Sequence, residues 1–209
     1  MAQGLLIALE GIDGSGKTTQ ARLLAAELQK MKQLQQLEPE AVLTQEPTQG
    51  VVGQKLRSYL LGPSRNLSPE EELHLFIMDR KEHVAEVIKP ALAQGKIVIC
   101  DRYYYSSAAY QGALGLDPAA IIAANEAFAP RPDLVFILTL PIPQALQRLS
   151  KKGKAGLQVS ESLHYLQQVA AVYDSFKGPQ FRRLEATPDP MALHQLILAE
   201  TRKALQEIN

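Results

Sequence analysis

The 209-residue chain has a single cysteine, Cys100, and no excess of charge of either sign. One cysteine excludes a disulfide framework and a zinc site built from cysteines. The basic and acidic side chains number 22 each, so no overall basic excess indicates a nucleic-acid partner, and none is expected. The histidines are not spaced like metal ligands and are expected to be surface or core residues. They are His74, His83, His164 and His194.

Long apolar runs are missing as well. The apolar start at residues 5–9 is much shorter than the core of a signal peptide, and it ends at Glu10. No run approaches the roughly 20 apolar residues that a membrane span needs. The share of hydrophobic residues, 46%, is ordinary for a globular protein and supplies enough apolar material for one core. We therefore expect a cytoplasmic protein without membrane association, folded as a single domain over residues 1–209.

Short apolar runs alternate with helical patterns along the whole chain. Runs typical of buried strands lie at 5–10, 41–45, 96–100, 134–140 and, more weakly, 181–185. This alternation predicts an α/β fold with a five-stranded parallel sheet flanked by helices. Ligands of such sheets bind beyond the carboxyl ends of the strands. The chain positions that this rule places on one rim are 10–17, 46 and 101–102.

Helices are predicted between these strands from the spacing of apolar residues and from start and stop signals. Their expected ranges are 17–31, 51–61, 69–94, 104–128 with a break near 112–118, 143–149, 159–176 and 190–207. The helix at 69–94 has the clearest start, because Ser68 is followed by Pro69 and by Glu71 as a capping box. Pro90 is expected to bend this helix or to end it early.

A glycine-rich stretch, GIDGSGKT, follows the first expected strand and matches the phosphate-loop pattern G-x-x-x-x-G-K-[ST]. The glycines let backbone N–H groups converge on phosphate oxygens at the start of the next helix. In this pattern Lys17 reaches the outer phosphates and the Thr18 hydroxyl coordinates Mg²⁺. No Asn-Lys-x-Asp stretch, which we would expect in a guanine-selective switch, is present. The chain is therefore expected to bind a nucleoside triphosphate.

Two further pairs of residues suit a second substrate. Asp101 can hold Mg²⁺ and Arg102 can clamp a phosphate with two hydrogen bonds, although a surface ion pair is the simpler alternative. Phe76 and Arg80 are one helical turn apart, so a ring and a guanidinium could together recognise a nucleobase. A core phenylalanine and a solvated arginine explain the same spacing. The residues alone leave both pairs open.

The combined pattern closely resembles the thymidylate kinase family of P-loop nucleoside monophosphate kinases. The resemblance rests on LEGIDGSGKTTQ, on QEPT followed by KLRSYLL, on LFIMDRKEHVAEVIKPALAQGKIVICDRYYYSSAAYQG and on RPDLVFILTLP, which lie between positions 5 and about 150. It implies a three-layer P-loop NTPase fold with a short lid at about 148–158. It also implies transfer of the γ-phosphate of ATP to dTMP, a magnesium ion and a homodimer.

The resemblance also implies roles for individual residues. Asp13 should bind the 3′-hydroxyl of dTMP, Arg102 its phosphate, and Asp101 with Thr18 the magnesium. Tyr110 should pack where a ribose 2′-hydroxyl would lie. The remaining residues expected around dTMP are Glu46, Arg57, Phe76, Arg80, Ser106, Ser107 and Gln111. The residues expected to hold ATP are Gly11, Ile12, Asp13, Gly14, Ser15, Gly16, Lys17, Thr18, Thr19, Arg148 and Lys152.

The lid segment departs from the family pattern. Gly14 stands where some members have a basic residue, and the Asp-Arg pair that many bacterial members have late in the lid is replaced by Gly156-Leu157. We expect Arg148, together with Lys151, Lys152 or Lys154, to close over the phosphates, and a solvated basic loop is the alternative. The residues expected to act in catalysis are Lys17, Asp13, Arg102 and Arg148.

Two other functions remain open at this point. Another nucleoside or nucleoside monophosphate kinase could use the same scaffold, because thymine selectivity rests on Phe76, Arg80 and Tyr110 alone. A protein that binds ATP without transferring phosphate would fit the missing lid arginines. A screen of acceptor nucleotides distinguishes the three.

Overall fold

The computed structural model describes residues 4–34, 40–62, 66–151, 163–187 and 189–208. Its strands form one parallel sheet in the order β2-β3-β1-β4-β5, which confirms the predicted α/β class and the five-stranded sheet. The strands are β1 (Leu5–Glu10), β2 (Ala41–Gln45), β3 (Ile97–Asp101), β4 (Leu134–Thr139) and β5 (Phe181–Glu185). The third strand begins and ends one residue later than its sequence pattern predicts.

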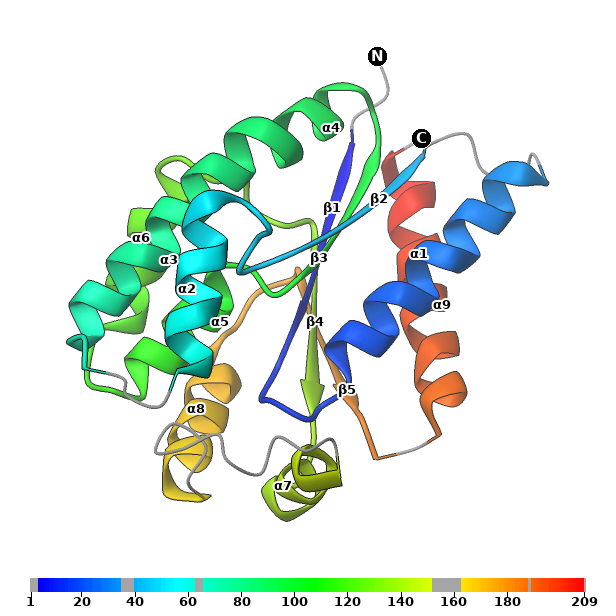
Figure 1. Cartoon of the computed structure of the whole chain (residues 1–209). Helices are drawn as coiled ribbons and strands as arrows, with labels where there is room; N and C mark the ends of the chain where they lie inside the picture. Colours follow the sequence, from blue (N-terminus) through cyan, green and yellow to red (C-terminus); the bar gives the residue numbers. More distant parts are fainter. Residues whose placement is uncertain (1–3, 35–39, 63–65, 152–162, 188, 209) are drawn as a thin grey trace.

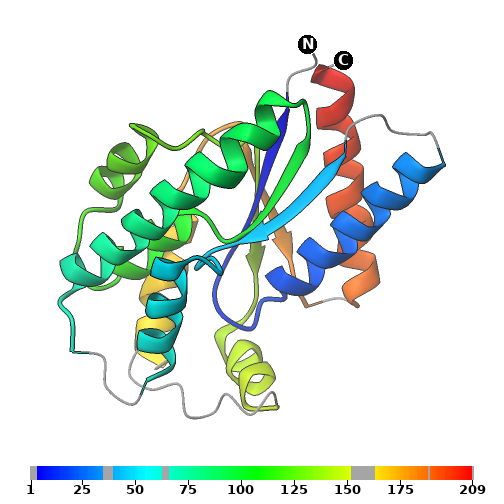
Figure 2. The same ribbon diagram turned by 45° about the horizontal axis from the view of Figure 1, so that its top comes forward.

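Helices cover both faces of the sheet (Figures 1 and 2). One face is covered by α1 (Lys17–Gln33) and α9 (Pro190–Ile208). The helices of the other layer are α2 (Val51–Leu61), α3 (Pro69–His83), α4 (Lys89–Ala93), α5 (Tyr104–Gly112), α6 (Pro118–Glu126) and α8 (Leu163–Ser175). The short helix α7 (Ile142–Lys151) lies beyond the end of β4 (Figure 1). Within the described ranges, no helix combines the length and apolarity needed to cross a membrane.

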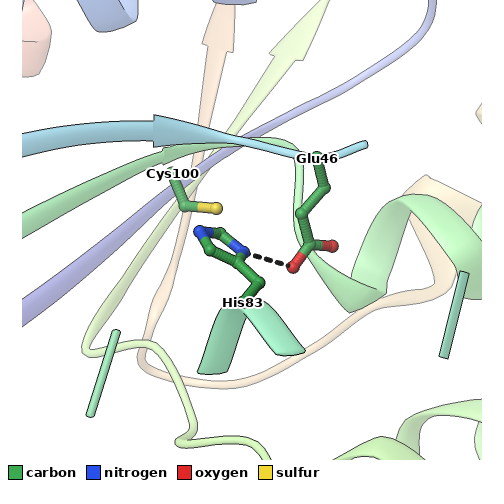
Figure 3. Close-up of side chains that lie close together, drawn as sticks. All are labelled: Glu46, His83 and Cys100. Carbon is green, nitrogen blue, oxygen red and sulfur yellow. Dashed lines mark hydrogen bonds and ion pairs between the residues drawn. The ribbon is translucent and has the colours of Figure 1, made fainter. Parts of the chain in front are cut away.

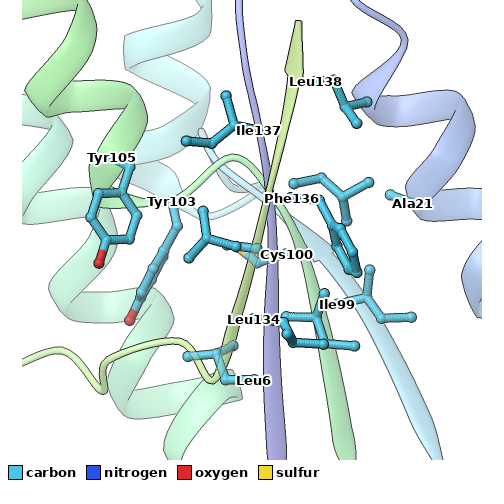
Figure 4. Packing of buried hydrophobic residues seen from close by; sticks show 14 of the residues in the cluster. Leu6, Ala21, Ile99, Cys100, Tyr103, Tyr105, Leu134, Phe136, Ile137 and Leu138 are labelled. Carbon is cyan, nitrogen blue, oxygen red and sulfur yellow. The ribbon is translucent and has the colours of Figure 1, made fainter. Parts of the chain in front are cut away.

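The core lies on both faces of the three central strands. All residues of β1 and β3 are buried, as expected for parallel strands covered on two sides. Figure 4 shows Phe136 and Ile99 on the side of Ala21 in α1, with Tyr103 and Tyr105 on the opposite side. Burying a large apolar side chain contributes about 1.5–3 kcal/mol, so these strands hold the layers together.

The helical segment at 69–93 changes its hydrogen-bond pattern before Pro90. The capping box at its start is present, because Glu71 N donates to Ser68 Oγ and Ser68 N donates to the Glu71 carboxylate. After His83 comes the π-helical turn η1 (Val84–Ile88), in which Lys89 N donates to the carbonyl of Val84. The α-helical ladder therefore shifts by one residue before the proline, and α4 then continues to Ala93.

The carboxyl ends of the central strands meet as predicted. Gln45 pairs with Asp101, and Asp101 pairs with Leu9. Just beyond these pairs, Glu46 N donates to the Asp101 carbonyl at 3.1 Å, and Arg102 N donates to the Leu9 carbonyl at 3.1 Å. The sheet therefore delivers the phosphate loop, Glu46 and the Asp101-Arg102 pair to the same rim.

Candidate active site

The phosphate loop closes around the side chain of Lys17. Its ammonium group donates to the carbonyl oxygens of Gly11 and Ile12, both at 2.9 Å. Gly16 precedes the helix with a φ of 98°, a left-handed conformation that suits glycine. The backbone N–H groups at the start of α1 thus face the concave side of the loop, where an anion is favoured.

The pKa values of both ionisable groups of the loop are lowered, which disfavours the charged form of Lys17 and favours that of Asp13. Burial and the neighbouring Arg102 cation lower the pKa of Lys17 to about 8, despite the carboxylates around it. Burial alone would raise the pKa of Asp13, but the cations of Arg102 and Lys17 outweigh burial and lower it to about 2. Asp13 is therefore ionised at neutral pH, whereas the charge of Lys17 responds to pH near 8.

Gly14 has a second constraint besides its φ of 83°. A Cβ atom at this position would lie 2.7 Å from the carbonyl oxygen of Ala145 in α7. We expect Gly14→Ala to lower the free energy of unfolding by about 1–2 kcal/mol through its left-handed backbone. We expect the collision of this Cβ atom with α7 to lower the free energy of unfolding by at least about 1 kcal/mol more. Urea denaturation of the ligand-free protein measures both contributions together.

Gly16→Ala is the matched control for this substitution. Its φ is also positive, but a Cβ atom there would meet nothing within 4 Å. The difference between the two variants therefore isolates the contact of the loop with α7. Equal losses of stability in Gly14→Ala and Gly16→Ala would show that α7 does not restrict the loop.

Two oxygen-bearing side chains, Thr18 and Asp101, lie beside the loop. The Thr18 hydroxyl donates to Asp101 Oδ2 at 2.5 Å, which joins the first turn of α1 to the end of β3. Hydroxyl and carboxylate oxygens are the ligands that Mg²⁺ prefers, and it commonly takes few protein ligands in addition to phosphates and water. The Thr18–Asp101 pair therefore fits the magnesium site expected from the sequence.

Arg102 and Asp13 form an ion pair across the rim of the sheet. Arg102 NH1 also donates to Ser106 Oγ at 3.1 Å, and the guanidinium lies 5.2 Å from the centre of the Tyr110 ring. The Tyr110 hydroxyl donates to Asp13 Oδ2 at 3.1 Å and accepts from Asp13 N at 3.0 Å. Arg102 has a φ of 70°, a conformation uncommon for side chains other than glycine and frequent in active sites. Two further predicted residues, Ser106 and Tyr110, thus contact the partly exposed Arg102–Asp13 ion pair.

Glu46 is a buried carboxylate held from two sides. Arg80 Nε donates to Glu46 Oε2 at 2.8 Å, and Arg80 NH2 forms an ion pair with the same oxygen at 2.7 Å. His83 Nδ1 lies 2.9 Å from Oε1. Figure 3 shows His83 between Glu46 and Cys100. Arg80 is only 1% exposed, so the alternative of a solvated arginine is wrong.

The group Glu46, His83 and Cys100 resembles a set of metal ligands, with one ligand atom of each within 4.8 Å of the others. Each of these atoms already has a hydrogen-bond partner. The second ring nitrogen of His83 lies 2.6 Å from the Thr44 hydroxyl, and the Cys100 thiol lies 2.9 Å from the carbonyl of Arg102. Burial and the neighbouring carboxylates raise the pKa of Cys100 well above its usual value, so the thiol stays protonated. These contacts position Glu46.

The residues expected around a base lie where α3 meets α5. Arg80 NH2 donates to Ser107 Oγ at 3.0 Å, and Gln111 Nε2 donates to Glu72 Oε1 at 2.8 Å. Gln111 Oε1 is buried and has no hydrogen-bond partner among the described residues. Phe76 is half-buried on α3, whereas the ring beneath the Arg80 guanidinium is that of Tyr103, 5.7 Å away. Arg80 and Ser107 are thus brought together, and Gln111 keeps one acceptor unused.

The segment after β2 is fastened to α2 and α3. Arg57 of α2 donates to the carbonyl oxygens of Pro47 and Thr48. Thr48 donates to the buried Asp79 of α3 from its N–H at 2.9 Å and its hydroxyl at 2.5 Å. Arg57 is predicted to lie near the acceptor. Its bonds to the backbone that follows Glu46 place it close to Glu46.

The phosphate loop, Glu46 and the Asp101-Arg102 pair line one cavity of about 360 Å³, which the residues expected around the base do not line. The predicted residues that it joins are Asp13, Gly14, Gly16, Lys17, Thr18, Thr19, Glu46, Arg57, Asp101 and Arg102. A larger cavity, of about 490 Å³, shares Thr18 and Asp101 with the first but extends between α1, β2 and η1. Only the smaller cavity contains Lys17 and Arg102, the two cations suited to phosphates.

The expected lid is described only in part. Arg148 of α7 is half-buried, and its guanidinium lies 3.5 Å from the Gly14 carbonyl and 2.9 Å from that of Ala186. Lys151 is exposed at the end of α7. Lys152 and Lys154 lie outside the described residues. Arg148 is therefore the basic residue that α7 places against the phosphate loop.

Several residues that hold the site gave no sequence signal. Asp79, His83 and Asn125 anchor Glu46, Thr48 and Arg80, with Arg80 NH1 donating to Asn125 Oδ1 at 2.7 Å. Each lies in an ordinary helical pattern, where spacing alone does not identify a polar side chain that turns inward.

Comparisons with known proteins agree with this geometry. A family model described as thymidylate kinase matches residues 9–197. Over 196 residues the chain is 41% identical to a thymidylate kinase of Brachyspira hyodysenteriae, covering 94% of this chain and 92% of the relative. A thymidylate kinase of Akkermansia muciniphila is 42% identical over 203 residues, covering 97% and 92%. One of Xanthomonas campestris is 45% identical over 186 residues, covering 89% and 78%.

Proposed function

This chain belongs to the thymidylate kinase family and catalyses the ATP-dependent phosphorylation of dTMP to dTDP, and we propose how its own residues perform that transfer. The observation that carries the proposal is the cavity in which the phosphate loop faces the Asp13–Arg102 pair. A donor phosphate on the loop and an acceptor phosphate on Arg102 would meet across this cavity.

The donor side is built from the phosphate loop. Backbone N–H groups between Gly11 and Thr19 bind the phosphates of ATP, and Lys17 moves from its carbonyl partners to the phosphate oxygens. Arg148 adds a guanidinium from α7, which is supported by its contact with the Gly14 carbonyl. Of the other basic residues expected in the lid, Lys152 stays a prediction.

The acceptor side is built from the ion pair. Arg102 binds the phosphate of dTMP with its planar guanidinium, and the ionised Asp13 accepts a hydrogen bond from the 3′-hydroxyl. The Tyr110 ring fills the space beside Asp13 and disfavours a 2′-hydroxyl. Ser106 holds the Arg102 guanidinium in place, and Glu46 and Arg57 line the same cavity near the acceptor phosphate.

The base lies between α3 and α5 in this proposal. Phe76 stacks on thymine and Arg80, with Ser107 beside it, donates to O4. The unused acceptor of Gln111 suits a ring N–H of the base, because a buried amide oxygen without a donor is costly. These placements explain why a pyrimidine with an N–H and a carbonyl is preferred.

Transfer between two phosphates demands alignment and charge compensation more than proton transfer. Lys17 and Arg102 both line the cavity and offset the repulsion between the donor and acceptor phosphates. Thr18 and Asp101 would hold Mg²⁺, which neutralises charge on the phosphates when bound. No general base is needed, because the acceptor oxygen is already an anion.

A homodimer and a single domain remain part of the proposal. Large apolar side chains on α2 and α3 support an interface, since Leu61 is 70% exposed, Val51 67% and Met78 44%. One sheet joins strands from both ends of the chain, which supports one domain. The product dTDP would serve dTTP synthesis.

An ADP-coupled assay with Mg-ATP and six acceptors tests the proposed specificity. The acceptors are dTMP, dUMP, dCMP, UMP, AMP and GMP. We expect strong turnover of dTMP and little of dCMP, UMP, AMP and GMP, because O4 and the 2′ position are both recognised. Turnover of dUMP should be weaker than that of dTMP, because dUMP lacks only the apolar methyl group of thymine. Faster turnover of dCMP would assign the site to another nucleotide. ATP binding without any turnover would favour a protein that only binds ATP.

A further inference from the structure

Glu10 is a buried carboxylate at the end of β1, fully hidden from solvent. It accepts hydrogen bonds from Tyr103 N at 2.9 Å and Ser106 N at 3.2 Å, both at the start of α5. It also accepts from Ser106 Oγ at 2.6 Å and from the Tyr173 hydroxyl of α8 at 2.9 Å. A buried carboxylate is tolerated when its oxygens are satisfied in this way, so Glu10 ties three elements together.

Ser106 carries this contact to the ion pair. Its hydroxyl donates to Glu10 and accepts from Arg102 NH1 at 3.1 Å. The Tyr173 hydroxyl lies 3.1 Å from Ser106 Oγ as well. A continuous line of hydrogen bonds therefore runs from α8 through Glu10 and Ser106 to the Arg102 guanidinium.

The same helix touches the other partner of the ion pair. The Tyr165 hydroxyl donates to the carbonyl of Tyr110 at 3.0 Å, and the Tyr110 side chain holds Asp13. Tyr165 and Tyr173 are about two helical turns apart, so they lie on one side of α8. Helix α8 thus supports Asp13 through one tyrosine and Arg102 through the other.

We propose that Tyr173 is a positioning residue for the transfer, whose hydroxyl fixes the Arg102 guanidinium by way of Glu10 and Ser106. The proposal rests on the proposed role of Arg102 as the holder of the acceptor phosphate. Burial and the charge of Glu10 raise the pKa of Tyr173, so its hydroxyl keeps the proton that it donates. Tyr173 does not line the reaction cavity and acts only through its neighbours.

Tyr173→Phe removes the hydroxyl and keeps the ring. Glu10 then loses one of its four donors and Ser106 loses the neighbouring hydroxyl at 3.1 Å, so the serine that contacts Arg102 is held less firmly. A displaced guanidinium aligns the acceptor phosphate poorly, and small misplacements cost up to about a hundredfold. We expect kcat/KM for dTMP to fall about tenfold or more, with a higher KM for dTMP. The KM for ATP should stay within about twofold, because the Lys17 contacts are unchanged.

Tyr104→Phe is the matched control. Tyr104 is also buried, and its hydroxyl donates to a carboxylate, Glu126, at 3.0 Å, but it has no contact with the ion pair. Both variants lose one buried tyrosine hydroxyl, so a general loss of stability should affect both alike. A KM does not depend on the fraction of folded enzyme, which separates positioning from a purely structural role.

Ser106→Ala and the double variant with Tyr173→Phe give the second measurement. If both side chains act through one line to Arg102, the double variant should lose little more than Ser106→Ala alone. The proposal is overturned if the two losses multiply, if Tyr173→Phe matches Tyr104→Phe, or if the KM for ATP rises as much as that for dTMP. The unmodified enzyme is assayed in parallel with the best of the six acceptors, so a wrong acceptor assignment shows there and not in the variant.

Discussion

Replacing Arg102 by leucine is expected to lower kcat/KM for dTMP by about 10³-fold or more. An arginine that meets transferring phosphates in a desolvated site contributes 10³ to 10⁵ in rate in related reactions. Arg102 also keeps Asp13 ionised, so its loss raises the pKa of Asp13 from about 2. Two of the proposed partners of dTMP are therefore weakened by one substitution. Steady-state kinetics with dTMP varied at saturating Mg-ATP measure the effect.

Two further arginine variants complete this experiment. Arg102→Lys keeps the charge but loses the planar fork, so an intermediate loss is expected. Arg131→Leu removes an arginine whose side chain is 66% exposed and pairs with Glu126. Neither residue lines the cavity, so this variant should change little. An Arg102→Leu enzyme within tenfold of the unmodified one would remove Arg102 from the acceptor site.

Replacing Lys17 by methionine is expected to lower kcat by about 10²- to 10³-fold, since a charge aimed at the phosphates is lost. The same variant should be no less stable than the unmodified chain near pH 7. The folded-state pKa of Lys17 is about 8, below the usual 10.5, so its buried charge costs stability below pH 8. That cost fades as pH rises from 8 to 10.5, and the free enzyme gains stability over this window. Thermal unfolding of both proteins between pH 7 and 10 checks the sign.

The pKa of Lys17 also predicts that ATP binding takes up a proton near pH 8. Phosphates favour the charged amine, so its pKa rises in the complex and the Kd for ATP increases up to tenfold per pH unit above about 8. Calorimetric titrations at pH 8 in buffers with different ionisation enthalpies measure this uptake. Lys17→Arg, which stays charged, should abolish it. Equal proton uptake in Lys17→Arg would assign the proton to another group.

The fold and the position of the phosphate loop in it could be predicted because their signals are local. The loop between Gly11 and Thr18 is continuous in sequence, and the strands are recognisable as short apolar runs. Since parallel strands end on the same rim, Asp101 and Arg102 could be placed beside that loop from topology alone.

The supports of the site could not be predicted, because they join residues far apart in the chain. Tyr173 contacts Glu10, which lies 163 positions away in the sequence, and His83 contacts Glu46, which lies 37 positions away. Helical spacing predicts which side of a helix is buried but not which polar atom on that side finds a partner. Arg80 shows the same limit, since a charged residue in a helix is usually solvated and this one is buried.

The π-helical turn at Val84–Ile88 separates two tasks of one long helical segment. One additional residue in a turn rotates everything that follows by about 100° relative to a regular α-helix. The part before it can therefore aim Asp79, Arg80 and His83 at the substrate rim, while the part after it aims Ala91 at the core. Residues before the turn can therefore change to adjust substrate contacts. Residues after the turn can change to adjust packing, and the two sets of changes need not affect each other.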